Sequence, residues 1–418
     1  MITNYNSNET IYSEPYEKVQ AFSKSDTSEI FGWFISPLTG TEFTNEIWEQ
    51  KPCIVSRKNE NYYITLFKGS DLNTLLEFSR FSPTEIRIVS NGQQPLFSEY
   101  TKANGRLDIG RISEYYLNGY SIVIHGLENF IAPIAEFTQS LRQFFSARVL
   151  VNAYLTPKGS QALKAHYDNH DVFVIQVEGN KNWHLYHSAA NCPLDGSIQP
   201  TFSRDELSQP EEIRLEKGDV MYIPRGWVHD AEATEESSLH LTIGIHPTQW
   251  VDFMSKTLVA LSLTHEPLRR SLPLGFLRNP EVLNKLQQEL IQLASVLKEE
   301  GTAEHAYSIL QSEFIQGENA LPGDSLIKSL DNISQITLDS LVTKRPCTYS
   351  KLITTNESIS IQFNNATVQA PLFYTDALIY ISNSIDEFVV SELPGLSDKN
   401  KISLVQRLVR DGFLLYRL

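Results

Sequence analysis

The residues that could carry chemistry in this chain are His166, Asp168 and His229. His166 and Asp168 form an H-x-D triplet, and residues i and i+2 of a β-strand project from the same face. His229 follows 63 positions after His166, just past a Pro-Arg-Gly corner. Two histidines and one carboxylate form the facial triad of non-haem Fe(II) oxygenases, which leaves coordination positions free for a cosubstrate and O2. Nitrogen and oxygen ligands suit Fe(II), whereas a structural zinc site more typically closes with thiolates.

The elements around the triplet matter, because H-x-D alone is easily met by chance in a chain with ten histidines. A lone triplet could equally be a polar strand edge. Residues 171–178 form an apolar, β-branched strand that closes in a Glu-Gly-Asn turn, and residues 183–186 predict the next strand. A turn at 216–219 leads into the apolar strand 220–223, which precedes His229. This order predicts an α+β fold whose core is a double-stranded β-helix, the jelly roll of the cupins.

The block around the triplet resembles the JmjC-type ribosomal oxygenases, which are Fe(II)- and 2-oxoglutarate-dependent hydroxylases of ribosomal proteins. The resemblance extends from about Phe31 to His246 and more loosely to the end of the chain. Order, spacing and identity agree in Asn152-x-Tyr154-x-Thr156-Pro157-x-Gly159-Ser160-Gln161, His166-Tyr167-Asp168, Val172-Phe173, Gln176 and Glu178-Gly179-x-Lys181-x-Trp183.

The resemblance implies a role for each of six residues. It makes His166, Asp168 and His229 the catalytic iron ligands, with 2-oxoglutarate and O2 as cosubstrates. Lys181 matches the basic residue that holds the distal carboxylate of 2-oxoglutarate. Asn152 matches an asparagine near the cosubstrate, and Tyr154 matches a tyrosine that lines the substrate pocket.

Other polar residues near these positions have simpler interpretations. We expect His125 to be structural, His170 and His187 to lie on the surface, and Arg225 to stabilise its turn. Because Lys181 and Trp183 share one strand face, His184 should point to the opposite face and into solvent. A strand over 239–246 would place three polar side chains on one face that could line the pocket: His240, Thr242 and His246.

Composition limits the class of protein. At 418 residues the chain should hold two or three domains. A net charge of -15 argues against direct nucleic-acid binding and favours a basic protein or peptide partner. Three scattered cysteines suit free thiols in a reducing compartment. The polar first residues show no signal peptide, and no run of 18 apolar residues predicts a membrane span, so we expect a cytoplasmic protein.

The pattern along the chain predicts four segments. These are a polar N-terminal tail (1–27), a JmjC/cupin catalytic domain (28–250), a helical dimerisation region (251–321) and a winged-helix-like domain (322–418). Outside the jelly roll we expect helices over 41–50, 110–118 and 134–145, and strands over 86–89 and 121–124. Thr41 would cap the first helix.

Two later features concern partners. A helix over 281–300 carries an apolar stripe formed by Leu283, Leu286, Leu290, Leu293 and Leu297. The stripe could pack within its own domain, but the family dimerises through this region, which favours a homodimer. In 322–418 we expect helices at 325–330 and 403–412 and a hairpin at 358–370. Basic and acidic residues nearly balance there, so DNA binding is not expected.

The leading hypothesis is a 2-oxoglutarate-dependent dioxygenase that hydroxylates a protein side chain. The resemblance to the family implies that the target is a histidine or arginine of a ribosomal protein. One alternative is the same chemistry on another peptide or a small molecule, since a fold does not fix a substrate. Another is a non-catalytic cupin-like binding protein, although a scaffold has no need to keep the triad and Lys181 together. The sequence does not identify the target residue or the role of the C-terminal domain.

Overall fold

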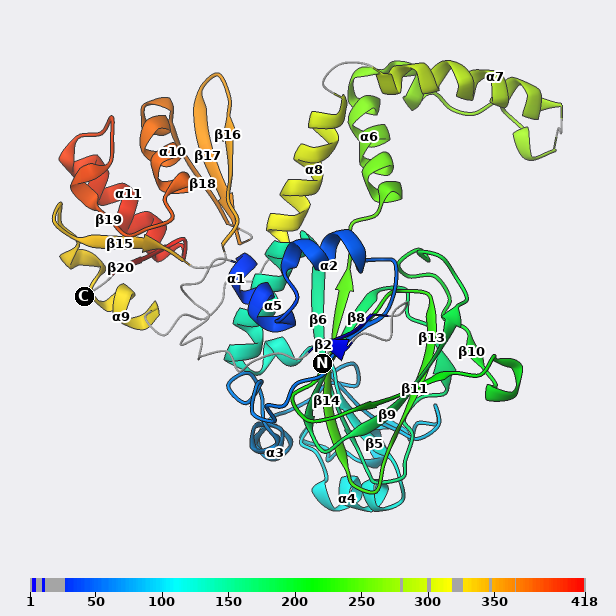
Figure 1. The fold of residues 1–418 in the computed structure, drawn as a ribbon. Helices are drawn as coiled ribbons and strands as arrows, with labels where there is room; N and C mark the ends of the chain where they lie inside the picture. The colour runs from blue at the N-terminus through cyan, green and yellow to red at the C-terminus, as the bar shows by residue number, and fades with distance from the viewer. Residues whose placement is uncertain are drawn as a thin grey trace. The chain divides into compact units, whose positions relative to one another are not determined.

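The computed structural model describes residues 2–4, 10–11, 27–278, 281–298, 302–317, 326–345, 348–364 and 366–416. The chain forms two compact units, Met1–Pro247 and Thr248–Leu418 (Figure 1). Most of the expected tail, the 321/322 boundary, Cys347, and the helix end at 299–300 lie outside the described residues. Among the helices that the structure describes, none has the length and hydropathy needed to cross a membrane.

Two antiparallel sheets form the centre of the first unit, as the sequence predicts. The larger sheet has the described strand order β2 (Thr10–Ile11), β1 (Ile2–Asn4), β3 (Cys53–Val55), β12 (Val220–Ile223), β8 (Asp171–Glu178), β14 (Ser238–His246), β6 (Arg148–Thr156), β5 (Ser121–Ile124) and β4 (Ile86–Val89). The smaller sheet has the order β10 (Thr201–Phe202), β7 (Ala165–His166), β13 (Trp227–Ala233), β9 (Lys181–Ser188) and β11 (Glu211–Leu215). The consecutive strands β6 to β9, and again β11 to β14, alternate between the larger and the smaller sheet, which is the jelly-roll arrangement.

The two faces of the larger sheet have different chemistry because side chains alternate along each strand. On β14, Leu239, Leu241, Ile243 and Ile245 belong to the main hydrophobic core. Helices pack on that outer face and supply its aromatic residues: α1 (Thr27–Ile35), α2 (Gly40–Glu46) and α5 (Ala132–Phe145). The intervening residues of β14 point to the inner face, where they meet the smaller sheet. The outer layer therefore stabilises the fold and leaves the inner face available for polar groups.

The remaining helices of this unit are α3 (Gly69–Phe78) and α4 (Ile109–Leu117). Three helix and terminus predictions need correction. The first helix spans Gly40–Glu46 and not 41–50, because Thr39 and Glu42 form a capping box in which each side chain bonds the other's backbone N–H. Asp108 caps α4, which begins one residue earlier than expected. Ile2–Asn4 pairs with β3 and is therefore a strand, not part of a polar tail.

Two turns depend on glycine. Gly179, between β8 and β9, has φ +63, and a Cβ there would lie 2.0 Å from the carbonyl oxygen of Ser237. Gly226, before β13, has φ +85, and its Cβ would lie 1.8 Å from the carbonyl oxygen of Ala190. Any larger residue would displace these turns. They hold Lys181 and His229 at the starts of their strands.

The second unit contains two groups of elements. The first group has helices α6 (Trp250–Thr264), α7 (Val282–Ala294) and α8 (Thr302–Gln316), of which α6 and α8 pack together. The second has two small sheets, β19 (Phe388–Val389), β15 (Leu341–Lys344), β20 (Leu414–Tyr416) and β16 (Lys351–Thr354), β17 (Ser358–Phe363), β18 (Ala366–Pro371). They share a core with α10 (Thr375–Asn383) and α11 (Asp398–Arg410), and α9 (Leu326–Asp331) packs on α11.

The predicted hairpin at 358–370 is confirmed, and α11 corresponds to the last helix predicted over 403–412 but begins five residues earlier and ends two residues earlier. Strand β16, which extends the hairpin, and helix α10 were not predicted. The winged-helix likeness of this group stays a prediction.

Candidate metal centre and cavity

The structure brings His166, Asp168 and His229 together at one edge of the smaller sheet. Strands β7 and β13 are antiparallel neighbours, and His166 lies directly opposite His229 in their register. Asp168 follows β7, and its carbonyl oxygen accepts a hydrogen bond from the Gly226 N–H at 2.9 Å. That bond ties the loop with the carboxylate to the corner that precedes His229. Three residues from two distant segments therefore meet because of strand pairing.

The backbone sets the tautomer of both imidazoles. His166 Nδ1 lies 2.8 Å from the Lys164 carbonyl oxygen, and His229 Nδ1 lies 2.9 Å from the Trp227 carbonyl oxygen. Since a carbonyl only accepts, each Nδ1 must carry the hydrogen and donate it. Each Nε2 then keeps its lone pair, the form in which a neutral histidine binds a metal.

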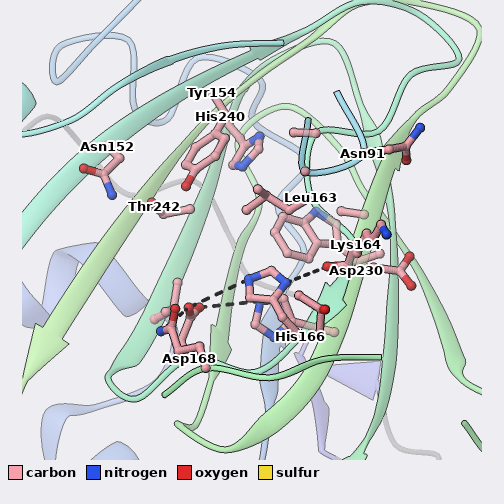
Figure 2. A pocket seen from close by; sticks show the side chains of 18 of the residues that line it. Asn91, Asn152, Tyr154, Leu163, Lys164, His166, Asp168, Asp230, His240 and Thr242 are labelled. Carbon is pink, nitrogen blue, oxygen red and sulfur yellow. Dashed lines mark hydrogen bonds and ion pairs between the residues drawn. The ribbon is translucent and has the colours of Figure 1, made fainter. Parts of the chain in front are cut away.

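The two Nε2 atoms face the Asp168 carboxylate, and Figure 2 shows His166 and Asp168 in this arrangement. Oδ1 of Asp168 lies 3.8 Å from Nε2 of His166, and Oδ2 lies 3.6 Å from Nε2 of His229. The ligand atoms of all three residues lie within 4.8 Å of one another, close enough to hold one metal ion. The donor set is two imidazoles and one carboxylate, which matches the facial triad expected from the sequence.

Burial and neighbouring charge keep the centre in its metal-binding form. Burial lowers the pKa of His229 to about 4, and protonation of the neighbouring His166 ring would lower it further, so the His229 imidazole is neutral at pH 7. Burial raises the pKa of Asp168, but the nearby imidazoles of His170 and His166 outweigh it and hold that pKa below its usual value. The carboxylate is therefore ionised while His229 keeps its lone pair.

A polar network supports the strand that carries His229. The Asp230 carboxylate is fully buried and accepts hydrogen bonds from Tyr186 Oη at 2.8 Å and Arg204 Nε at 3.0 Å. His184 Nδ1 lies 2.8 Å from the same carboxylate. The expectation that His184 faces solvent is therefore wrong: it points away from Lys181, as predicted, but Asp230 and Arg204 cover it on that face. Sequence alone did not show this cover.

A cavity of about 580 Å³ opens in front of the triad, between the two sheets (Figure 2). Lys181 lines it at the start of β9 and is 2% exposed. Its Nζ donates to Thr156 Oγ1 at 3.1 Å, and no carboxylate is paired with it among the described residues. Burial lowers the pKa of Lys181 to about 7. A buried ammonium without a counter-ion is expensive, so this group is suited to receive an anionic ligand.

Asn152 also lines the cavity, from β6. Its Oδ1 accepts from the Gly126 N–H at 3.3 Å, and the His125 side chain also bonds the amide. His125 in turn accepts at Nε2 from Arg87 Nε at 2.8 Å. His125 thus has the structural role predicted for it. Arg87, which lines the cavity from β4, was missed, although its alternation with Ile86 and Ile88 was the available signal.

Tyr154, His240 and Thr242 face the cavity from adjacent strands, which confirms the expectation for His240 and Thr242 on β14. His246, which was expected on the same face, does not line the cavity. Tyr154 and His240 stack with ring centroids 4.9 Å apart and an interplanar angle of 8°. His246 lies further along β14 beside Asp195 and stacks on His170. His170 was expected on the surface, which is wrong. It lines the cavity and packs against Gly244, where a Cβ would lie 2.7 Å from its ring.

Two remaining expectations concern residues outside the cavity. His187 is exposed, as expected. Arg225 has the structural role assigned to it, since Nη1 donates to Asp171 Oδ2 and Nη2 pairs with Glu49, each at 2.6 Å. Tyr222 Oη donates to the same Asp171 carboxylate. This buried ion pair fixes the corner that leads to His229.

Comparison with known proteins agrees with this geometry. The JmjC domain family matches residues 127–253, which include the triad. Ribosomal oxygenase 1 of Danio rerio is 29% identical over 278 residues, covering 64% of this chain and 50% of that protein. Ribosomal oxygenase 2 of Bos taurus is 30% identical over 312 residues, covering 71% of this chain and 65% of that protein.

The bifunctional lysine-specific demethylase and histidyl-hydroxylase NO66 of Aedes aegypti is 32% identical over 258 residues, covering 59% of this chain and 40% of that protein. The chain thus spans half or less of the lengths of the Danio and Aedes relatives. The Escherichia coli ribosomal oxygenase YcfD, in a complex with cobalt and 2-oxoglutarate, shares the fold at a TM-score of 0.50 and 16% identity, covering 91% of this chain and 99% of YcfD. By its sequence, its triad and these likenesses, the chain carries a JmjC domain over residues 127–253 and is similar to the ribosomal oxygenases.

Proposed function

We propose that this chain is an Fe(II)- and 2-oxoglutarate-dependent oxygenase that hydroxylates a protein side chain, with a histidine or arginine of a ribosomal protein as its target. The observation that carries the proposal is the convergence of His166, Asp168 and His229 at one end of a cavity that also holds the buried, unpaired Lys181. A scaffold would gain nothing from burying a lysine without a counter-ion. The ribosomal oxygenases among its relatives support the choice of substrate class.

The residues of the chain divide the work between binding and positioning. His166 and His229 would present Nε2 lone pairs to Fe(II), and Asp168 would supply its carboxylate. Fe(II) with 2-oxoglutarate supplies the activation of O2 that a protein side chain cannot provide. Lys181 would form an ion pair with the distal carboxylate of 2-oxoglutarate. Asn152 presents its amide to the same cavity, and Tyr154 forms the wall beside which the target side chain would lie.

The proposed partners follow from charge and from exposed apolar surface. A net charge of -15 favours approach of a basic protein segment, and direct nucleic-acid binding is not expected. None of the described side chains of α7 is buried, and Leu283 and Leu290 are 67% and 61% exposed. Leu286, Leu293 and Leu297 of the stripe are half-buried, so the described residues of its own unit cover it only in part, which supports the alternative of a homodimer. A cytoplasmic location stays a prediction.

The test is succinate formation by the purified protein with Fe(II), ascorbate and 2-oxoglutarate, measured with and without a protein fraction from ribosomes. We expect iron-dependent turnover that the fraction stimulates, and a mass gain of one oxygen atom on a single peptide. Stimulation by other peptides alone would favour the same chemistry on another substrate. An iron-loaded protein that forms no succinate under any of these conditions would be a non-catalytic binding protein.

A further inference from the structure

Two buried polar atoms of the cavity wall have no hydrogen-bond partner among the described residues. They are Nε1 of Trp183 and Nδ1 of His240. Trp183 is 5% exposed and His240 is 2% exposed, and both line the cavity. Buried polar groups are almost always hydrogen-bonded, so two such atoms at one place indicate a missing acceptor.

Both groups line the same cavity as Lys181, one from the same strand and one from the facing sheet. Trp183 lies two residues after Lys181 on β9, so their side chains share the inner face of the smaller sheet. His240 projects from β14 of the facing sheet, and its ring meets the Trp183 ring edge-on at a centroid distance of 5.5 Å. The charge of Lys181 also reaches His240, because together with burial it lowers the pKa of that imidazole well below its usual value.

A carboxylate bound at this place needs more than one partner. Its two oxygens offer about four acceptor positions, and an ammonium alone leaves most of them unfilled. A buried ion pair is favourable only when additional hydrogen bonds satisfy the remaining lone pairs. The Trp183 indole N–H can only donate, and neutral His240 can carry its hydrogen on Nδ1.

We propose that His240 and Trp183 bind the distal carboxylate of 2-oxoglutarate together with Lys181, so that one ammonium and two ring N–H groups form a three-donor anchor. The proposal rests on the proposed function and adds two residues to its cosubstrate site. It also explains why a histidine and a tryptophan are buried in a cavity wall without partners. The stack of His240 on Tyr154 holds the imidazole in place.

The experiment measures binding of two keto acids to the Mn(II)-loaded protein by titration calorimetry. 2-Oxobutyrate has the same keto acid end as 2-oxoglutarate and lacks the distal carboxylate. His240→Phe keeps the ring against Tyr154 and removes the N–H. We expect it to weaken 2-oxoglutarate binding about tenfold to a hundredfold, the range for one hydrogen bond to a charged group. Binding of 2-oxobutyrate should not change, and Trp183→Phe should behave in the same way.

Two further variants make the result specific. His240→Asn places an amide N–H near the former Nδ1 position and should recover part of the loss. His187→Phe makes the same exchange at an exposed position of β9 and should bind both keto acids like the wild type. If His240→Phe and Trp183→Phe keep the wild-type preference for 2-oxoglutarate over 2-oxobutyrate, the proposal that these two residues bind the distal carboxylate is wrong, and the proposed function stands. If the wild type binds neither keto acid with Mn(II), both are wrong.

Discussion

His166 and His229, 63 positions apart in sequence, are direct cross-strand partners of β7 and β13, with ring centroids 4.7 Å apart. This pairing determines the metal centre, because each Nδ1 is held by a backbone carbonyl and each Nε2 is turned towards Asp168. The pairing of the strands, and not a bound metal, fixes the positions of these three side chains. The fold should therefore persist when a ligand is removed.

We predict that Asp168→Ala and His229→Ala abolish iron binding and 2-oxoglutarate turnover. Each variant leaves only two ligands, while the pairing of β7 and β13 remains. Metal content after reconstitution and the melting temperature of the metal-free protein would check this. His187→Ala is the control, because it removes an exposed imidazole. Full turnover by either ligand variant would contradict the assignment of the triad.

We predict that Lys181→Ala keeps the metal but loses one to two decades of 2-oxoglutarate affinity. A hydrogen bond to a charged group contributes about 1.5–3 kcal/mol, which corresponds to that range. Lys181→Arg should recover part of the loss, because it restores the charge with a different geometry. Anaerobic titrations with iron present would measure it, with exposed Lys158→Ala as control. Unchanged affinity in Lys181→Ala would place the anchor on another residue.

The pKa of Lys181 predicts proton uptake when 2-oxoglutarate binds. Burial lowers that pKa to about 7 in the empty cavity, so above pH 7 the amine is mostly neutral. A bound carboxylate favours the charged form and raises the pKa, so binding takes up a proton above pH 7 and none well below it. Affinity should therefore fall as pH rises from 7 to 9.

Calorimetry at pH 8 in phosphate and in Tris would show this uptake, because the two buffers have different ionisation enthalpies. The apparent binding enthalpy should differ between the buffers for the wild type and agree between them for Lys181→Ala. Equal enthalpies for the wild type would mean that Lys181 is already charged in the empty cavity.

Much of this site could be predicted from sequence, because short-range patterns of residues define the strands that carry it. The strands 86–89, 121–124, 171–178 and 220–223 agree with the structure because short runs rich in apolar, β-branched residues between turn residues leave little choice of element. The two histidines that were assigned wrongly show what such patterns do not predict. His184 was placed by alternation along its strand and His170 was expected on the surface, but their burial depends on Arg204 and Gly244, which belong to segments distant in sequence.

We predict that Arg225→Met destabilises the protein by about 3–5 kcal/mol, because it leaves the fully buried Asp171 carboxylate without its cation. Chemical denaturation of the metal-free protein would measure the change in the free energy of unfolding. Arg214→Met is the matched control, since its side chain is 58% exposed and pairs only with an exposed glutamate; it should change stability by less than about 1 kcal/mol. A similar loss of stability in both variants would mean that the buried ion pair of Arg225 contributes no more than an exposed one.

The last prediction decides what the apolar stripe of α7 contacts. Glutamates in place of Leu286 and Leu290 put two charges into a stripe that its own unit leaves largely uncovered. If two copies of the chain pair through it, light scattering should show half the wild-type mass, with a cooperative melt retained. Gln288→Glu adds charge to the opposite side of the same helix and should leave the mass unchanged. An unchanged mass with a collapsed melt in the double variant would instead place the stripe in the core of the single chain.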